Sequence, residues 1–324
     1  MNTEFFTFPA VGKSVMPRVS FGEALVELGR VRDDFVVFDA DVCASTQTAM
    51  FRDSFPDRFY QCGIAEANMI GMAAGMATLG ITPFVSTFAV FLAKRALDQI
   101  RVSIAYPGLN VKLNGAYGGL PTGKAGATHS SVEDIAIMRA MPNMTVLVPG
   151  DPVETKLATK LALEIEGPVY LRTVRCGVPV VFDASTHTLE YGKGRVLKEG
   201  DEAAVISTGM MTPKTVAAVE LLEKKGIRVT HIHMPFIKPI DREIIAEAAS
   251  RCGRIVTVEN HSIIGGLGGA VAEVLAETVP SRLLRIGFPD IFMESGDNEE
   301  IFSKMRINVN DIAERVEAFI AGTR

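Results

Sequence analysis

The chain has 324 residues, which is long enough for about two domains and for a core that needs no disulfide or metal to fold. Its net charge of −5 argues against a general nucleic-acid-binding surface. The four cysteines have no CxxC or zinc-like spacing, and the five histidines form no paired metal motif. We therefore expect reduced, mostly buried thiols in a cytoplasmic protein.

One segment raises the question of a membrane span. Residues 67–85 are largely apolar, but they include Asn68, several glycines and Pro83. This composition favours a helix that packs closely inside a protein. The first residues include Glu4 and lack the pattern of a signal peptide. We expect a protein without a membrane segment.

Short apolar runs alternate with helical patterns along the chain. We predict strands at residues 35–38, 111–113, 145–148 and 169–171, and helices near residues 20–30, 66–79, 88–105, 132–140 and 151–166. Ser20 with Glu23, and Ser130 with Glu133, have the spacing of capping boxes, which predicts that two helices begin there. Strand–helix alternation is typical of an α/β fold in which helices cover both faces of a largely parallel sheet.

The alternation is interrupted between about residues 182 and 200, where the sequence is polar and rich in Thr, Gly and Lys. It then resumes with predicted strands at residues 203–207, 227–232 and 254–258 and a helix at residues 213–225. We predict a domain boundary near residue 188, which divides the chain into residues 1–187 and 188–324. The predicted fold class is α/β, with two open, mostly parallel, doubly wound sheets.

Ligands of open α/β sheets bind just beyond the carboxyl ends of the strands. Residues 39–41 (Asp-Ala-Asp) follow the first predicted strand, and residues 114–115 (Asn-Gly) follow the second. Both segments therefore lie where a site is expected, although many such loops are only turns.

Glu66 stands at the start of a helical pattern rich in Ala, Gly and Met. One interpretation is a first-turn glutamate that the helix dipole favours. The other is a buried carboxyl suited to sharing a proton with a ring nitrogen, because the apolar run that follows would remove it from water. The pattern leaves both interpretations open.

Two aromatic residues follow, Phe88 and Phe91. Their i, i+3 spacing predicts that they share one face of a helix. Core packing explains such a pair in most proteins, and a platform for a flat heteroaromatic ring is the alternative.

A glycine-rich loop at residues 114–129 leads to the next predicted helix and ends in His129, which is a candidate proton donor or a surface residue. Arg172 and Arg175 follow the strand at residues 169–171, where arginines can bind a phosphate or a carboxylate. Residues 259–269 carry glycines without a GxGxxG or GxxxxGK[ST] spacing, so we expect a tight strand-to-helix turn there.

Taken together, these segments resemble the transketolase family across nearly the whole chain, in the order of its pyrimidine-binding domain and its C-terminal domain. Residues 63–68 (Gly-Ile-Ala-Glu-Ala-Asn) resemble the stretch around the cofactor-activating glutamate. Residues 87–91 (Thr-Phe-Ala-Val-Phe) resemble the stretch that lines the aminopyrimidine. Residues 126–144 resemble the substrate-site histidine and the helix after it, and residues 259–268 match a turn shared by many enzymes of this superfamily.

The resemblance implies that thiamine diphosphate is the cofactor. It implies that Glu66 hydrogen-bonds a pyrimidine nitrogen and so activates the cofactor for attack on a ketose carbonyl, while Phe88 and Phe91 form the platform of the ring. Asp41 and Ile64 would also lie near the cofactor. The expected activity is transfer of a two-carbon ketol unit from a ketose to an aldose.

On the substrate side, the resemblance implies that His129 contacts the sugar hydroxyls and takes part in catalysis. Ser45 and Arg175 would hold the far end of the sugar, which is often phosphorylated.

The loop that faces the substrate departs from the family pattern. Tyr117 stands where many transketolases have a substrate-contacting histidine, and Ala125 where they have an aspartate. Ser130 replaces a common Gln, and Lys94 replaces an aromatic residue. Because a site built to bind a hydroxyl discriminates strongly for it, we expect an atypical sugar, either branched or carrying an anionic group that Lys94 or Lys124 meets.

The chain also lacks the Gly-Asp-Gly and downstream Asn that the cofactor's metal, Mg²⁺ or Ca²⁺, and its diphosphate require. The nearest string, at residues 295–298, does not fit. We therefore expect no metal ligands in this chain and an N-terminal partner subunit that carries this motif, in an α2β2 heterotetramer.

Two alternatives remain. The β subunit of a thiamine-dependent 2-oxoacid dehydrogenase has the same architecture, but residues 128–144 resemble transketolase and deoxyxylulose-phosphate synthase more closely. A non-catalytic subunit that kept the fold is the second alternative, and the retained cofactor-side residues argue against it.

Overall fold

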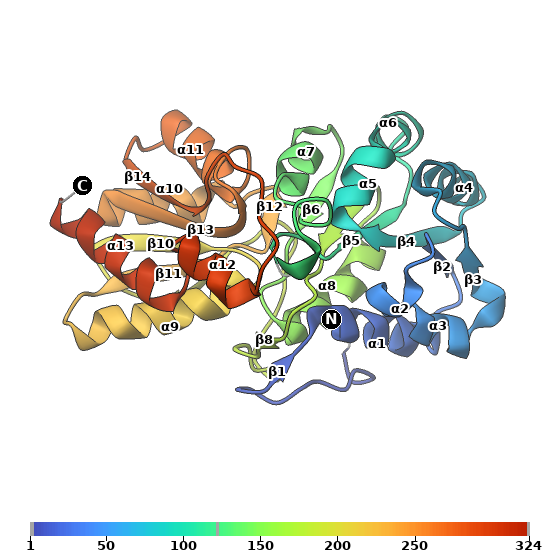
Figure 1. The fold of residues 1–324 in the computed structure, drawn as a ribbon, viewed down its shortest axis with the longest axis horizontal. Helices are drawn as coiled ribbons and strands as arrows, with labels where there is room; N and C mark the ends of the chain where they lie inside the picture. Colours follow the sequence, from blue (N-terminus) through green and yellow to red (C-terminus); the bar gives the residue numbers. More distant parts are fainter. Residues whose placement is uncertain (1–2, 121–122, 323–324) are drawn as a thin grey trace.

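The computed structural model describes residues 3–120 and 123–322, and these contain two large open sheets, of seven and five strands, and a small two-stranded sheet. The seven-stranded sheet occupies the blue-to-green half of the molecule in Figure 1, and the five-stranded sheet the yellow-to-red half. The larger sheet has the strand order β12 (Phe236–Lys238), β6 (Thr145–Leu147), β7 (Val169–Arg172), β5 (Lys112–Ala116), β4 (Thr82–Phe88), β2 (Phe35–Asp39), β3 (Phe59–Gln61). Its strands are parallel except for β12.

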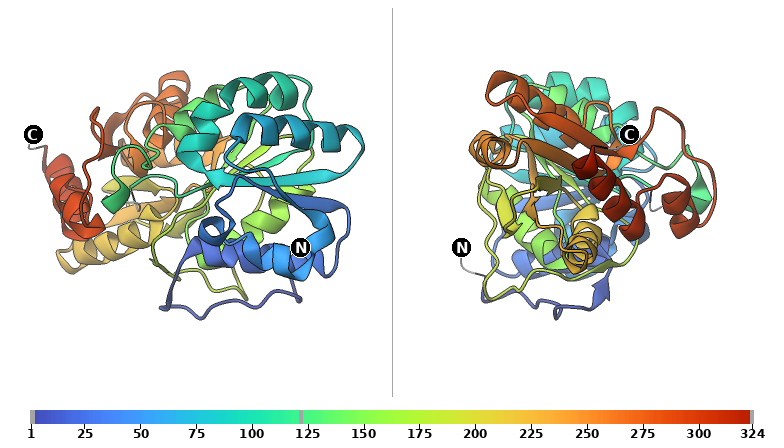
Figure 2. Two further views of the ribbon diagram at one scale, coloured as in Figure 1. Left: turned by 45° about the vertical axis from the view of Figure 1, so that its right-hand side comes forward. Right: turned by 90° about the vertical axis from the view of Figure 1, so that its left-hand side faces the viewer.

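Helices cover both faces of this sheet (Figure 2). Because successive side chains of a strand point to opposite faces, Phe35 and Val37 of β2 join one apolar cluster while Val36 and Phe38 join another. The first cluster includes residues of α1 (Pro17–Gly29), α3 (Ala49–Ser54) and α8 (Pro152–Glu164). The second includes residues of α4 (Glu66–Thr78), α5 (Ala89–Arg95), the π-helical turn η2 (Ile100–Ala105) and α7 (Asp134–Ala140).

The smaller sheet has the order β14 (Arg282–Phe288), β13 (Arg254–Ser262), β10 (Ala203–Ser207), β11 (Val229–His233), β9 (Arg195–Lys198), and β9 alone is antiparallel to its neighbour. Two helices, α10 (Arg242–Cys252) and α11 (Leu267–Glu277), contribute to the apolar cluster that also holds α4 and α5. The other face packs against α9 (Met211–Lys224), α12 (Asn298–Lys304) and α13 (Val309–Ala321). One apolar cluster thus runs through both halves of the chain.

The predicted fold class is confirmed, since both sheets are mostly parallel and covered on both faces. One strand departs from the simple division: β12 comes from the second half of the sequence but pairs with β6 in the first sheet. The boundary at residues 187 and 188 lies between β8 (Val178–Pro179) and β9, and we retain it as a proposal.

Both predicted capping boxes are wrong. Helix α1 begins at Pro17, whose fixed φ suits the first helical position, so Ser20 is buried inside the helix. Helix α7 begins at Asp134, and the Ser130 hydroxyl donates to the carbonyl of Gly126 rather than to a helix terminus. At α1, a proline outside the motif decides where the helix begins.

Three strands of the first sheet, β3, β4 and β12, were not predicted. Helix α4 ends at Thr78, and β4 begins only four residues later. Strand β4 is buried on both faces, so its sequence reads as a continuation of the apolar helix.

Within residues 3–120 and 123–322, no helix combines the length and apolar character needed to cross a bilayer.

Candidate functional site

The predicted site residues gather at one edge of the seven-stranded sheet. Strand β2 has β3 on one side and β4 on the other, so the strand order reverses there. Such a switch point leaves a crevice beyond the carboxyl ends of the strands. Asp41 follows β2, Glu66 follows β3, Phe88 ends β4, and Tyr117 follows β5. The parallel topology therefore brings together segments that lie far apart in the sequence.

Glu66 is the first residue of α4, and only 4% of its surface is exposed. Its Oε1 accepts a hydrogen bond from Nη1 of Arg95 at 2.8 Å. Glu66 is thus both a first-turn residue and buried, and its role toward a ring nitrogen stays a prediction. Arg95, at the end of α5, was not singled out from the sequence, although its spacing of four residues from Phe91 places it on the same helix face.

The aromatic rings lie side by side, but not on one helix as predicted. Phe88 ends β4 and precedes α5, whereas Phe91 lies inside α5. Their ring centroids are 5.5 Å apart, and Phe88 stacks on Tyr117 at 4.4 Å. The His129 ring contacts the Phe91 ring edge-on at 5.3 Å, and the Arg95 guanidinium lies 3.8 Å from the centroid of Phe91. The pair therefore belongs to a surface with Tyr117 and His129 rather than to the core alone.

Asp39, at the end of β2, organises the turn that carries Asp41 and Ser45. Its carboxylate accepts hydrogen bonds from the backbone of Val42 and from the hydroxyls of Thr46 and Thr48, at 2.7–2.8 Å. Burial raises the pKa of Asp39 to about 6. Asp41 has a φ of 64°, a conformation that is uncommon outside glycine, and its backbone N–H donates to Oε1 of Gln61.

Two other predicted residues lie at the margin of this surface. Ile64 is 74% exposed and lies two residues before the buried carboxylate of Glu66. Lys94 pairs with Glu133, so its charge already has an internal partner. Lys94 itself lies in the last turn of α5, the helix that also carries Phe91 and Arg95.

A cavity of about 360 Å³ lies beside Tyr117, and its charged lining residues are Arg18, Lys124, Arg175 and Asp297. Arg18 donates to the Ser45 carbonyl at 2.8 Å and to the Tyr117 hydroxyl at 3.2 Å. The guanidinium of Arg175 lies 5.5 Å from the centroid of Tyr117. Sequence reasoning missed Arg18, because nothing in a helix-start arginine indicates that it will face a loop about 100 residues away.

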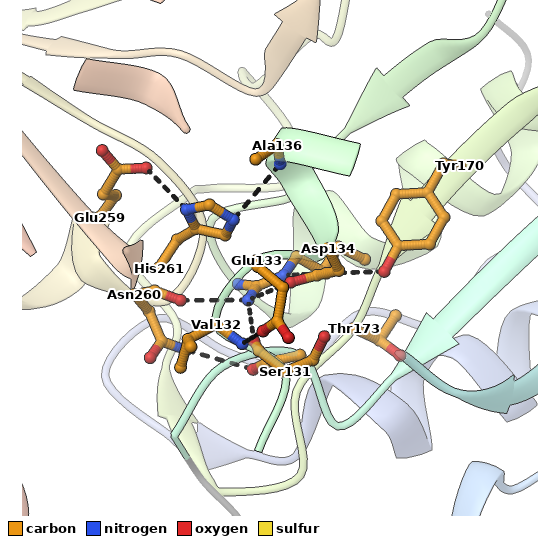
Figure 3. A network of polar contacts seen from close by, with 12 residues as sticks. Ser131, Val132, Glu133, Asp134, Ala136, Tyr170, Thr173, Glu259, Asn260 and His261 are labelled. Carbon is orange, nitrogen blue, oxygen red and sulfur yellow. Dashed lines mark hydrogen bonds and ion pairs between the residues drawn. The ribbon is translucent and has the colours of Figure 1, made fainter. Parts of the chain in front are cut away.

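Arg172 does not serve as a ligand for a small anion, because it already holds an internal carboxylate. Its guanidinium donates to both oxygens of Asp134, at 2.7 and 3.0 Å, and both side chains are buried. Tyr170 donates to the same carboxylate (Figure 3). Although burial raises the pKa of Asp134, the attraction of Arg172 lowers it below its ordinary value. Of the two candidate arginines, only Arg175 reaches the cavity.

The glycine-rich segment after β13 is a tight strand-to-helix turn, as predicted. The Glu259 carboxylate accepts hydrogen bonds from the backbone N–H groups of Leu267 and Gly268 at the start of α11. A Cβ on Gly266 would collide with that carboxylate. Burial raises the pKa of Glu259 to about 7. An internal carboxylate therefore occupies the helix terminus.

In the part of the chain that the structure describes, no three His, Cys, Asp or Glu side chains come together so that they could hold a metal ion. Residues 295–298 instead pack against the glycine-rich loop. The backbone N–H of Gly123 donates to Oδ1 of Asn298, and that of Gly296 donates to the carbonyl of Gly123.

Comparison with known proteins agrees with this geometry. Residues 13–179 match the family model of the transketolase pyrimidine-binding domain, and residues 192–312 match that of the transketolase C-terminal domain. A Methanocaldococcus jannaschii protein provisionally named transketolase C-terminal section is 46% identical over 92% of this chain and 94% of its own length. The 6-deoxy-6-sulfo-D-fructose transketolase subunit SqwH of a Clostridium species is 38% identical, over 91% of each chain.

Among solved structures, the inactive β4 tetramer of a split-gene transketolase superposes with a TM-score of 0.88 at 45% identity. The match covers 96% of this chain and all of that chain. The chain belongs to the transketolase family and comprises that family's pyrimidine-binding domain followed by its C-terminal domain.

Proposed function

We propose that this chain is the C-terminal subunit of a split, thiamine-diphosphate-dependent transketolase that transfers a two-carbon ketol unit from a ketose to an aldose. The observation that carries the proposal is the position of Glu66. Its buried carboxylate lies at the switch point of the sheet, linked through Arg95 to the ring of Phe91. A flat ring that needs both an aromatic neighbour and a carboxyl partner fits this arrangement.

The described residues fit the pyrimidine part of the cofactor. The hydroxyl of Thr87, the next-to-last residue of β4, is buried and has no hydrogen-bond partner among the described residues. The Arg95 side chain, which contacts both Glu66 and Phe91, is 47% exposed and can move aside without opening the core. Glu66, Phe88 and Phe91 would hold the pyrimidine, with Asp41 and Ile64 at its border.

When bound, thiamine diphosphate supplies a nucleophilic carbon that carries the two-carbon unit between sugars. In this proposal Glu66 holds or releases a proton at a ring nitrogen, and the phenylalanine rings orient the cofactor and exclude water. His129, whose Nδ1 lies 2.9 Å from the Thr128 hydroxyl, is the candidate for proton exchange with substrate hydroxyls.

A partner subunit would supply what these 324 residues lack, namely the Gly-Asp-Gly motif and the oxygen ligands of Mg²⁺ or Ca²⁺. Two observations support a partner subunit. Ile64 and Met72 expose large apolar side chains, and Gly71 and Gly75 of α4 face open space. The similar split-gene chain forms an inactive tetramer by itself. We propose an α2β2 assembly and a cytoplasmic location.

The substrate would carry an anionic group at its far end. Three cationic side chains, those of Arg18, Lys124 and Arg175, line the cavity beside Tyr117 with one carboxylate, that of Asp297, and none of the three forms an ion pair within the described residues. A relative with 38% identity is named for a sulfonated ketose, 6-deoxy-6-sulfo-D-fructose. Tyr117, which stacks on Phe88 and accepts from Arg18, would take the place of the usual histidine.

Reconstitution with the candidate N-terminal subunit tests the proposal. We expect two-carbon transfer between phosphorylated or sulfonated sugars when both chains, the cofactor and Mg²⁺ are mixed, and no turnover by either chain alone. Acyl transfer to a lipoyl domain from a 2-oxoacid would instead favour the dehydrogenase alternative. Tight cofactor binding and turnover by this chain alone would contradict the split-enzyme proposal.

The charge of Arg175 provides a test of substrate class. Arg175→Gln is expected to raise KM for an anionic ketose about ten- to hundredfold, the worth of one hydrogen bond to a charged group, with little change for a neutral ketose. Steady-state kinetics with matched neutral and phosphorylated ketoses measure the difference. The control, Arg30→Gln, lies at the exposed end of α1 away from the cavity. Equal effects of Arg175→Gln on both ketoses would refute a role in anion binding.

A further inference from the structure

The loop that carries Tyr117 and His129 packs against residues from the second half of the chain. Tyr117 and His129 lie in the segment between β5 and α7, drawn in green in Figure 1, and its short helix η3 (Gly123–Ala125) lies beside α12. Its geometry is therefore set by residues of the C-terminal domain as well as by its own sequence.

Asn260, in β13 of the five-stranded sheet, makes the central contact. The residue is 2% exposed, and its Oδ1 accepts from the backbone N–H of Leu120 at 3.1 Å. Its Nδ2 donates to the carbonyl of Gly118 at 3.2 Å and also lies 3.2 Å from the sulfur of Met210. One side-chain amide thus pairs with both groups that flank Gly119, as a neighbouring strand would do.

The loop is shaped to receive this amide. Gly119 has a φ of +77°, and a Cβ at that position would collide with the amide of Asn260. A hydrogen bond also joins the two ends of the loop at this position, because the backbone N–H of Gly119 donates to the carbonyl of Ser131 at 2.7 Å. Arg172 then donates to the carbonyls of both Ser131 and Asn260, at 3.0 and 3.1 Å. Figure 3 shows Asn260 and His261 facing the segment from Ser131 to Ala136.

The residue next to this anchor is strained. Tyr117 has a φ of +61°, which is costly for a non-glycine residue and persists only where the surroundings enforce it. That conformation lays the Tyr117 ring on Phe88 and directs its hydroxyl to Arg18. The pairing of Asn260 with Gly118 and Leu120 holds the backbone immediately after Tyr117.

We propose that Asn260 is a positioning residue of the C-terminal domain that fixes Tyr117 and His129 for sugar binding. The proposal rests on the proposed ketol transfer. The amide oxygen and the amide nitrogen of Asn260 form hydrogen bonds with the backbone of Leu120 and Gly118, which belong to the other domain. The residue therefore acts across the domain junction. The C-terminal domain would then help to shape the substrate site without contacting the sugar.

The test compares Asn260→Ala and Gly119→Ala with a structural control in the reconstituted complex. Each variant is expected to lower kcat/KM for the ketose about ten- to hundredfold, mainly through KM, because a buried donor or acceptor at the loop is left unpaired or displaced. Cofactor affinity and partner affinity should stay within twofold of the wild type. The control, Asn308→Ala, removes an asparagine that caps α13 in the same domain and does not touch the loop. It should lower stability without changing KM.

Hydrogen exchange of the chain alone supplies a readout independent of activity. Peptides covering residues 117–131 should exchange faster in both loop variants and at the wild-type rate in Asn308→Ala. Unchanged exchange, or equal KM effects in the control, would overturn the positioning role. If the wild-type complex transfers no ketol unit, the proposed function fails, while the exchange result still decides whether Asn260 holds the loop. Gly119→Ala alters only the loop side, so it remains informative if Asn260→Ala does not fold.

Discussion

Replacing Glu66 with Gln is expected to slow ketol transfer by the reconstituted complex about 10³-fold, within the range that a positioned acid or base contributes. The amide keeps the size of the side chain and its place at the start of α4. It cannot, however, alternate between a protonated and an ionised form at a ring nitrogen. Steady-state rates at saturating cofactor and sugar measure the effect on kcat.

The matched control for this experiment is Glu243→Gln. Glu243 lies in the first turn of α10, its side chain is 81% exposed, and it pairs with Lys193 far from the site. This variant should turn over like the wild type. Partner affinity and the midpoint of thermal unfolding should be preserved in Glu66→Gln, so that the loss is chemical. Unchanged turnover in Glu66→Gln would favour the non-catalytic alternative.

The second large effect concerns stability. Asp134→Leu is expected to lower the free energy of unfolding by about 3–5 kcal/mol, because it leaves the charge of Arg172 buried without its partner. Arg172→Met should cost a similar amount, since it leaves the Asp134 carboxylate buried in the same way. Urea unfolding followed by circular dichroism measures each variant. The double variant should cost less than the sum of the two, because neither unpaired charge remains.

An exposed ion pair provides the control for this prediction. Arg228 and Asp201 also form a salt bridge, but their side chains are 69% and 56% exposed. Asp201→Ala should therefore cost less than about 1 kcal/mol. A similarly small cost for Asp134→Leu, or strict additivity in the double variant, would contradict a coupled buried pair.

The predictable part of the site consists of residues that local sequence motifs mark. Glu66 stands out because a single carboxylate opens an apolar helix, and the Phe88–Phe91 spacing is local as well. Even here, the prediction that both rings lie on one helix is wrong, because Phe88 ends a buried strand whose apolar sequence resembles the helix beside it. Burial on both faces removes the alternation that normally distinguishes a strand.

The residues that were missed act over long sequence separations. Arg18 meets Tyr117 99 residues away, and Asn260 meets Gly118 142 residues away. Arg172 is a candidate ligand in the sequence because it follows a predicted strand. Its actual partner, Asp134, lies on a different element and cannot be recognised from the sequence. No periodicity or spacing in the sequence carries such information, because the parallel sheet and the docking of the two domains create these contacts.

The sequence by itself therefore determined the family, the α/β class and the order of the two domains, and it marked the carboxylate and the rings that we propose for the cofactor side, because short local motifs record them. Only the tertiary structure decided how the proposed substrate side is built. There Arg18 donates a hydrogen bond to Tyr117, Arg172 forms an ion pair with Asp134, and Asn260 accepts a hydrogen bond from the loop backbone. The physical reason is that these contacts depend on which strand ends and loops the fold brings together.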